Sequence, residues 1–465
     1  MKKGNQIEAI NGEFQLHEPI IHLVQSFLNA KEAAQTAILS KSWRSAWLTR
    51  PNLDFSIPYR GEDEYLACVE KTIQRYEQSN LKIESLRLCN ENGGLYDCFG
   101  VFANDLITRA LKIGATHLSV HNIGTEMVLS QGVFEAENVV ELSLHGCKIK
   151  DLGFDQKVRC SKLESLNLSS VIISSEMISN IALCCPLIRK LSLCDVATFR
   201  FVIHFKHDDD DDDDDDVYYS FSRLPSLKDL TIRKCRTQEV SCPSLERLYF
   251  ATEHYTSVKL DVPSIRKFRF EIKYDEIPSL CFVSAHREWE CDVFIKIYLS
   301  SFSTSWFCSL NKLLTELSLS KMYLSLNIGM AQGMLYGCQF EVGAIRGLPK
   351  HKVETCTIDM LCPRAVDCFA FFHGLFQICR PTFIIVNYRL CNVDGIANNT
   401  MLHKTLARGL DDKCMYGLHD LEEVNVHLFD EDADAWRPLP LESLLDPSIS
   451  LSGGQKTRFQ LKWKM

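Results

Sequence analysis

A short hydrophobic phrase recurs between residues 81 and 430 of the chain. It places apolar side chains at the first, fourth and sixth positions with polar residues between them, as in Val139-x-x-Leu142-x-Leu144. The other copies are Leu163-x-x-Leu166-x-Leu168, Ile188-x-x-Leu191-x-Leu193, Leu227-x-x-Leu230-x-Ile232, Leu245-x-x-Leu248-x-Phe250, Ile265-x-x-Phe268-x-Phe270, Leu314-x-x-Leu317-x-Leu319 and Leu421-x-x-Val424-x-Val426, with weaker ones at Leu86-x-Leu88 and Leu118-x-Val120. Alternate residues of a strand share one face, and one such unit cannot bury its apolar face alone. The pattern therefore predicts a stack of parallel strands in an α/β fold.

The intervals between successive copies are similar to those of leucine-rich repeats. Starting from Leu142, the central residues are spaced by 24, 25, 39, 18 and 20 positions, close to the roughly 20–29 residues of that repeat. The family places Asn or Cys after the strand, and Cys147 and Cys235 occupy that position, whereas Val171 and Val196 do not. We therefore expect an irregular repeat array. The strands of an ordinary α/β domain are the alternative interpretation.

Residues 16–55 show a different pattern, typical of three short helices. In the first helix Glu18 can serve as the cap and Pro19 suits the first helical position, because proline lacks the N–H that is unsatisfied there. Apolar residues then follow at helical spacing. They are Ile20, Val24, Phe27 and Leu28.

The second and third helices are shorter and differ in composition. Asn29 ends the first helix, and the second is expected to begin near Lys31, with small residues and Ile38 packed closely. The third carries Trp43 and Trp47 one turn apart. A module of about 40 residues is too small to form a useful core alone, so we expect it to dock on another surface. A helical cap on the larger domain is the alternative.

The regions that flank the repeats also have helical or apolar patterns. Between residues 62 and 78, apolar side chains at helical spacing predict a helix that packs the N-terminal module against the first repeat; they are Tyr65, Val69, Ile73 and Tyr76. The apolar run after Val353 is expected to cap the repeat array.

Composition favours an intracellular interaction protein. The 465 residues are 46% hydrophobic, enough for large cores. The first 15 residues lack the apolar stretch of a secretory signal, and no 18 apolar residues run together. The 20 cysteines include no C-x-x-C pair, so we interpret them as reduced, buried small hydrophobes and expect no zinc site. The expected location is the nucleus, the cytoplasm or both, without membrane association.

The net charge of −9 comes from one segment. Residues 208–216 are nine consecutive aspartates, and without them the remaining 51 acidic residues balance the 51 basic ones. Runs of like charge repel themselves and are typically solvated insertions. A tether for a cation or a basic partner is the alternative. The charge therefore indicates no general preference for a partner.

The sequence shows no catalytic or cofactor-binding constellation. Residues 451–455 spell LSGGQ, the signature of ABC-transporter ATPases, but no phosphate-binding G-x-x-x-x-G-K-[S/T] loop occurs. We interpret this match as coincidence in a Ser/Gly turn. Zinc-protease, hydrolase and dinucleotide motifs are also missing, and no basic cluster with interleaved aromatics indicates nucleic-acid binding. We expect a non-enzymatic protein without cofactors or metals. A small-molecule hydrolase would require a deep polar pocket.

The N-terminal 40 residues resemble the F-box of plant F-box proteins, and with the repeats and tail the resemblance extends to the plant F-box/leucine-rich-repeat family. Two departures are His17, where the family has proline, and Asn29-Ala30, where it has Pro-Thr. The matching residues are Leu16, Ile20, His22, Ser26, Phe27, Leu28, Lys31, Ala33, Ala34, Thr36, Leu39, Ser40, Lys41, Trp43, Arg44 and Trp47.

The resemblance implies an organisation into four parts. These are an F-box at residues 13–55, a connecting helix or linker at 56–80, a leucine-rich-repeat solenoid at 81–430 with a poly-Asp insertion at 207–217, and a C-terminal tail of the repeat region at 431–465. The expected fold is α/β, with a three-helix F-box followed by an irregular solenoid and its stack of parallel strands.

The resemblance also implies a function: the substrate-recognition subunit of an SCF-type cullin-RING ubiquitin ligase. The F-box would bind the Skp-type adaptor, and through it cullin, while the repeats would hold an unknown target protein. The expected adaptor contacts are Leu16, Ile20, Ile21, Val24, Leu28, Leu39, Trp43 and Trp47. An interaction scaffold whose F-box no longer binds the adaptor is the alternative. A small hormone bound as a co-ligand is a related alternative, but no residue of the sequence indicates a pocket for it.

Overall fold

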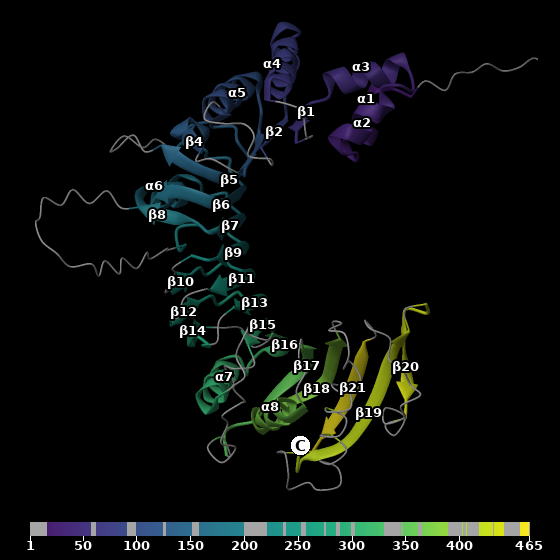
Figure 1. Ribbon diagram of the computed structural model, residues 1–465. Helices are drawn as coiled ribbons and strands as arrows, with labels where there is room; N and C mark the ends of the chain where they lie inside the picture. Colours follow the sequence, from purple (N-terminus) through teal and green to yellow (C-terminus); the bar gives the residue numbers. More distant parts are fainter. Residues whose placement is uncertain are drawn as a thin grey trace, which may run out of the picture. The chain divides into compact units, whose positions relative to one another are not determined.

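The computed structural model divides into two compact units, residues 1–185 and 186–465 (Figure 1). Both units combine helices with predominantly parallel strands, in agreement with the predicted α/β class. The structure describes residues 16–56, 62–90, 99–123, 127–150, 158–199, 221–235, 239–252, 257–273, 276–284, 289–298, 303–329, 345, 347–360, 365–388, 402, 406, 418–430, 432–440 and 456–464. The aspartate run and the LSGGQ match lie outside these residues.

The first unit begins with three short helices, α1 (Glu18–Ser26), α2 (Ala30–Thr36) and α3 (Lys41–Thr49). Glu18 is the first helical residue rather than the cap: the cap position is His17, whose side chain makes no capping hydrogen bond. Asn29 caps α2 reciprocally, because its Oδ1 accepts from the Glu32 N–H while the Glu32 carboxylate accepts from the Asn29 N–H. Ser40 caps α3 by accepting from the Trp43 N–H.

Five parallel strands of the first unit follow one another in chain order and in register. Leu86, Leu118, Leu142 and Leu166 lie opposite one another across four of them and are buried. The strands are β1 (Asn52–Phe55), β2 (Ser85–Asn90), β3 (His117–Asn122), β5 (Glu141–Lys150) and β6 (Ser165–Ser174), with β4 (Met127–Ser130) beside the second half of β5. The four copies of the hydrophobic phrase in this unit are therefore confirmed as strands.

Side-chain amides link neighbouring strands just beyond the apolar positions. Buried Asn90 donates from Nδ2 to Asn122 Oδ1 at 2.9 Å, and Asn122 donates to the Gly146 carbonyl at 3.0 Å. Gly146 adopts φ +67°, and a Cβ there would lie 1.9 Å from the Asn122 carbonyl oxygen. The sequence analysis missed this amide ladder, which satisfies polar groups that are costly to bury unpaired.

Helices connect the strands of the first unit. The helix predicted between residues 62 and 78 is present as α4 (Glu62–Gln78), and its four predicted apolar residues are buried. Tyr76 of α4 donates its hydroxyl to the Arg50 carbonyl at the end of the N-terminal module. The remaining helices of this unit are α5 (Phe99–Ile113), the short 3₁₀ helix η1 (Gln131–Phe134) and α6 (Ser175–Cys184).

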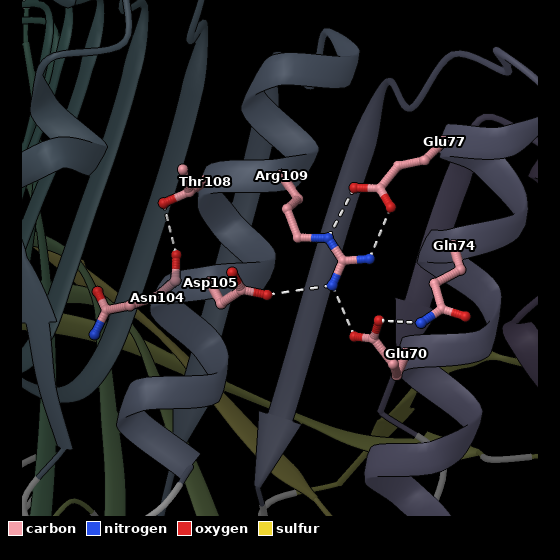
Figure 2. Close-up of polar contacts among 7 residues, drawn as sticks. All are labelled: Glu70, Gln74, Glu77, Asn104, Asp105, Thr108 and Arg109. Carbon is pink, nitrogen blue, oxygen red and sulfur yellow. Dashed lines mark hydrogen bonds and ion pairs between the residues drawn. The ribbon is translucent and has the colours of Figure 1, made fainter.

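One arginine joins α4 to α5, as Figure 2 shows. Arg109 of α5 binds Glu77 through Nε at 2.8 Å and through Nη2 at 2.9 Å, and binds Glu70 through Nη1 at 2.7 Å. Asp105 lies 3.2 Å from the same Nη1. The hydrogen bonds from Arg109 are the main cause that lowers the pKa of both Glu70 and Glu77.

The second unit continues with parallel strands. They pair in the order β7 (Lys190–Cys194), β9 (Asp229–Arg233), β11 (Arg247–Thr252), β13 (Lys267–Ile272), β15 (Glu290–Tyr298), β16 (Lys321–Gly329), β17 (His351–Met360) and β18 (Cys379–Tyr388). β8 (Ala197–Phe199) follows β7, and a second parallel sheet consists of β10 (Glu239–Ser241), β12 (Val258–Asp261) and β14 (Leu280–Ser284). The helices are α7 (Thr304–Glu316) and α8 (Ala365–Ile378).

The last three strands run antiparallel. β21 (Thr457–Trp463) pairs with β18 and with β19 (Leu421–Asp430), and β20 (Ala435–Leu439) pairs with β19. The predicted repeat at Leu421 is therefore a strand but not a parallel one. The predicted copy at Leu314, Leu317 and Leu319 is wrong, because Leu314 lies in α7 and Leu319 is exposed. The strand at this point is β16, which begins two residues later.

The cysteines of the described part are free thiols, and most are buried. Burial raises the pKa of Cys147 and Cys356 to about 12. Cys184, Cys281 and Cys308 are exposed, so the expectation of uniformly buried cysteines is wrong for these three. Among the helices described, none combines the length and hydropathy needed to cross a membrane.

Candidate docking surface

The interior of the three-helix module consists mainly of small side chains. Ile21 and the alanines at positions 30, 33 and 46 are buried between α1, α2 and α3. Gln25 is also buried, and its Nε2 donates to Thr36 Oγ1 at 2.9 Å and to the Trp43 carbonyl at 3.3 Å. These two hydrogen bonds connect α1 with both other helices. A small, partly polar interior leaves most large apolar residues of the module outside it.

The exposed apolar set of the module is made of the large side chains that remain in solvent. Phe27 is 81% exposed, Ile38 86% and Leu39 63%. The full set is Leu16, Ile20, Leu23, Val24, Phe27, Ile38 and Leu39. Three of them lie on α1 and a fourth, Phe27, is its C-terminal cap, and the four recur at helical spacing. Half of the exposed large apolar residues found in the described part of the chain belong to this set.

The structure divides the predicted adaptor contacts into three groups. Leu16, Ile20, Val24 and Leu39 are exposed, whereas Leu28, Trp43 and Trp47 are partly buried. Ile21 is fully buried and packs inside the module, so its side chain is not available to a partner. The Arg50 guanidinium lies 3.9 Å above the centre of the Trp47 ring and covers one of its faces.

The predicted contacts leave out three members of the exposed apolar set, namely Leu23, Phe27 and Ile38. Phe27 belongs to the stripe seen in the sequence, but the stripe alone does not say which members point outward. The expectation that Ile38 packs in the module is wrong, because the chain turns at residues 37–39, between α2 and α3. The sequence did contain a signal for this turn, because Ile38 lies two residues before Ser40, the residue that caps α3.

A concave surface lies on the outward face of the strands in the second unit. It is a hollow of about 570 Å³ along β9 to β17. Its charges are paired, since Lys267 lies 3.6 Å from Glu290 and Arg269 lies 3.9 Å from Asp292. Tyr249 donates its hydroxyl to Glu271, and burial together with this carboxylate raises the pKa of Tyr249 to about 12. The hollow therefore presents both positively and negatively charged side chains.

Two kinds of reactive site can be compared with the described residues, a metal centre and an activated thiol. No group of three or more His, Cys, Asp and Glu residues that could hold a metal ion occurs within the described ranges. The described cysteines with a resolved pKa shift have it raised, and burial is the first cause, which is the opposite of what a nucleophilic thiolate needs. The arrangement of the module and of the strand face is suited to binding other macromolecules.

Comparison with known proteins identifies relatives in Arabidopsis thaliana. An F-box/FBD/LRR-repeat protein is 24% identical over 277 residues, which cover 57% of this chain and 54% of the relative. Two F-box/LRR-repeat proteins are 29% and 28% identical over 202 and 199 residues, each match covering 39% of this chain and 40% and 39% of the relative. The matches thus span about half the length of these relatives or less. No family model matches the chain.

These relatives confirm the resemblance to plant F-box/leucine-rich-repeat proteins that the sequence indicated. Several other relatives carry the name FBD-associated F-box protein, at similar identity. The plant origin of all the relatives agrees with the family that the N-terminal motif suggested.

Proposed function

We propose that this chain is the substrate-recognition subunit of an SCF-type ubiquitin ligase. The three-helix module would be its F-box and would bind the Skp-type adaptor. The stacked strands would be its leucine-rich repeats and would hold a target protein. The names of the relatives support this assignment, and so does the succession of short helices and in-register parallel strands.

The observation that carries the proposal is the exposed apolar set of the module. Large contiguous apolar surfaces are rarely left in solvent by monomeric proteins and usually mark a binding site. Phe27 and Leu39 are mostly exposed, whereas the leucines at the repeated positions of β2, β3, β5 and β6 are buried. An apolar partner surface that covers them would gain about 25 cal/mol for each Å² removed from water.

The chain would contribute proximity rather than chemistry. Holding a target protein beside a ubiquitin-conjugating enzyme raises the effective concentration of target lysines near the thioester. The polar strand face of the second unit, with paired charges such as Lys267 and Glu290, is the surface we assign to the target. Domain limits of 13–55 for the F-box, 56–80 for the linker, 81–430 for the repeats and 431–465 for the tail belong to the same proposal.

The test is binding of the purified full-length chain to a recombinant Skp-type adaptor, measured by isothermal titration calorimetry. We expect the Phe27→Ala and Leu39→Ala double variant to bind at least roughly tenfold more weakly, since buried apolar anchors dominate interface energies. Leu319→Ala is the matched control, because Leu319 of the second unit is 63% exposed, the same fraction as Leu39. Its affinity should equal that of the wild type.

Two results would overturn the proposal. A folded wild-type chain that does not bind the adaptor would favour the alternative, a repeat scaffold with a non-functional F-box. Equal affinity of the double variant and the wild type would show that the adaptor binds elsewhere. Circular dichroism of each variant verifies that the helices are intact, which both substitutions should allow because the two side chains are exposed.

A further inference from the structure

The C-terminal antiparallel strands carry aromatic and basic side chains on the face opposite their apolar core. On β21 the residues Thr457, Phe459 and Leu461 point into the core, whereas Arg458 and Gln460 point outward. We call the outward side chains the C-terminal aromatic face. It consists of Phe383, His427, Phe429, Trp436, Lys456 and Arg458, of which five are partly buried and Lys456 is exposed.

Cations of this face lie over aromatic rings. The Arg458 guanidinium carbon lies 4.5 Å from the centre of the Trp436 ring and 5.2 Å from that of Phe383. Lys456 Nζ lies 5.7 Å from the Phe429 ring, and the Phe429 and Trp436 rings meet edge to face at 5.2 Å. The rings come from β18, β19 and β20, so the cluster extends across the whole antiparallel part of the sheet.

The cations of the face lack acidic partners among the described residues, unlike their neighbours. Arg437 lies 2.5 Å from Asp430, and Lys462 on the same strand as Arg458 lies 3.7 Å from Glu422. Arg458 forms no such pair, and its Nε is buried without a hydrogen-bond partner. His427 Nδ1, on the adjacent strand opposite Arg458, is in the same situation. Buried polar atoms without partners are costly, so neither group is stabilised by its surroundings in the way that the paired cations nearby are.

Desolvation affects both of these groups. It is the first cause that lowers the pKa of His427, followed by the charge of Arg458, and it also lowers the pKa of Arg458. The imidazole is therefore neutral near pH 7 and adds no charge. The face then offers two unpaired cations set among aromatic rings, a combination that is complementary to one or two carboxylates flanked by apolar side chains.

We propose that the C-terminal aromatic face binds an acidic peptide segment of a partner protein. A carboxylate of the segment would accept hydrogen bonds from Arg458, and an adjacent apolar side chain would pack on Trp436 and Phe429. A nucleic acid is disfavoured, because its affinity depends on many phosphate contacts and the face supplies only Lys456 and Arg458. The proposal does not depend on adaptor binding, since these residues lie in the second unit and the three-helix module lies in the first.

The experiment uses the full-length chain and a fluorescein-labelled synthetic peptide in which glutamates alternate with leucine and phenylalanine. Fluorescence anisotropy should show saturable binding to the wild type, and the same peptide with glutamines in place of glutamates should bind at least roughly tenfold more weakly, because charge-assisted hydrogen bonds are lost. Arg458→Gln should reduce the affinity by a similar factor. Lys462→Gln is the matched control, an exposed cation of the same strand that already has a partner, and should leave the affinity unchanged.

Other outcomes would overturn the proposal. No saturation below about 1 mM peptide, a range in which even weak recognition is detected, or equal affinity for the glutamine peptide would exclude recognition of carboxylates. Displacement of the peptide by a single-stranded oligonucleotide that itself binds the wild type more tightly than Arg458→Gln would assign the face to nucleic acid. Lys456→Gln alters only an exposed residue, so it keeps the test valid if Arg458→Gln fails to fold; affinity unchanged by Lys456→Gln would then contradict the proposal.

Discussion

The N-terminal helices and the parallel strands of the first unit differ in how far their apolar side chains are exposed to solvent. On β5, Leu142 and Leu144 are almost completely buried, and polar residues alternate with them on the outward face. At the C-terminal cap of α1 and in the turn before α3, Phe27 and Leu39 are mostly exposed. The strands bury their apolar residues by stacking, whereas the helices leave several of theirs in solvent. The difference teaches that exposure, and not composition, distinguishes the three-helix module from the strands.

The most direct test of this difference is to shorten a leucine to alanine in each of the two regions. Leu144→Ala should lower the free energy of unfolding by about 2–5 kcal/mol, because it leaves a cavity in a closely packed interior. Leu39→Ala should change it by no more than about 0.5 kcal/mol, since the side chain is already largely in water. Urea unfolding followed by circular dichroism measures both values. Equal losses would show that the module buries Leu39 in solution.

A second prediction concerns the glycine in the middle of β5. Gly146→Ala should cost about 1–3 kcal/mol, since a non-glycine residue is strained at φ +67° and its Cβ would collide with the Asn122 carbonyl. Ser170 on the neighbouring strand β6 already adopts φ +50°, so Ser170→Gly serves as the control and should be neutral or slightly stabilising. Thermal unfolding distinguishes the two. A Gly146→Ala variant as stable as the wild type would mean that β5 can shift at this position without cost.

The third prediction concerns the arginine that joins α4 to α5. Arg109→Met should destabilise the first unit by about 1–2 kcal/mol, because Glu70 and Glu77 lose their shared hydrogen-bond donor and repel each other.

The same contacts predict a pH dependence. The pKa of Glu70 and that of Glu77 lie below their ordinary value of 4.5 in the folded chain, so their contribution is complete above that value and is lost as the pH falls through the lowered pKa. Stability measured between about pH 5 and pH 3 should therefore fall more steeply in the wild type than in Arg109→Met. Identical slopes in the two proteins would contradict the assignment.

The smallest effect is expected at the cap of α2. Asn29→Ala removes one side of the reciprocal hydrogen bonds with Glu32 and should cost about 1 kcal/mol, typical of a lost helix cap. Asn29→Asp retains the acceptor and should cost much less. Helix content and urea unfolding are the measurements. If Asn29→Ala leaves helix content and the free energy of unfolding unchanged, packing alone stabilises the three-helix module.

The strands were predictable where alternation of apolar and polar residues leaves only one interpretation. Leu142 and Leu144 fit a strand because the polar residue between them has to point to the other face. Leu314, Leu317 and Leu319 follow the same phrase, but a spacing of three also suits a helix. The buried residues before them recur at helical spacing and favour α7; they include Trp306, Phe307, Leu310 and Leu313. A local sequence pattern cannot distinguish a strand from a helix when its apolar residues fit the spacing of both.

The exposed apolar set was predictable as a segment of the chain but not residue by residue. Ile20 and Ile21 are neighbours of the same kind, yet one is exposed and the other is fully buried. Which of them faces inward depends on how α1 rotates against α3, and the buried Gln25 with its bonds to Thr36 and Trp43 fixes that rotation. The orientation of α1 depends on its contacts with the other helices, and the apolar stripe of α1 alone does not reveal those contacts.

The uneven protection of the thiols provides a means of following the molecule in solution. Maleimide reagents react with thiolates, and burial suppresses ionisation at sites such as Cys147. Among the described cysteines, Cys184 lies exposed on α6 of the first unit, and Cys281 and Cys308 lie exposed on β14 and α7 of the second. Native attachment points for fluorophores therefore exist on both units, so that energy transfer between dyes could report their separation with and without a bound partner.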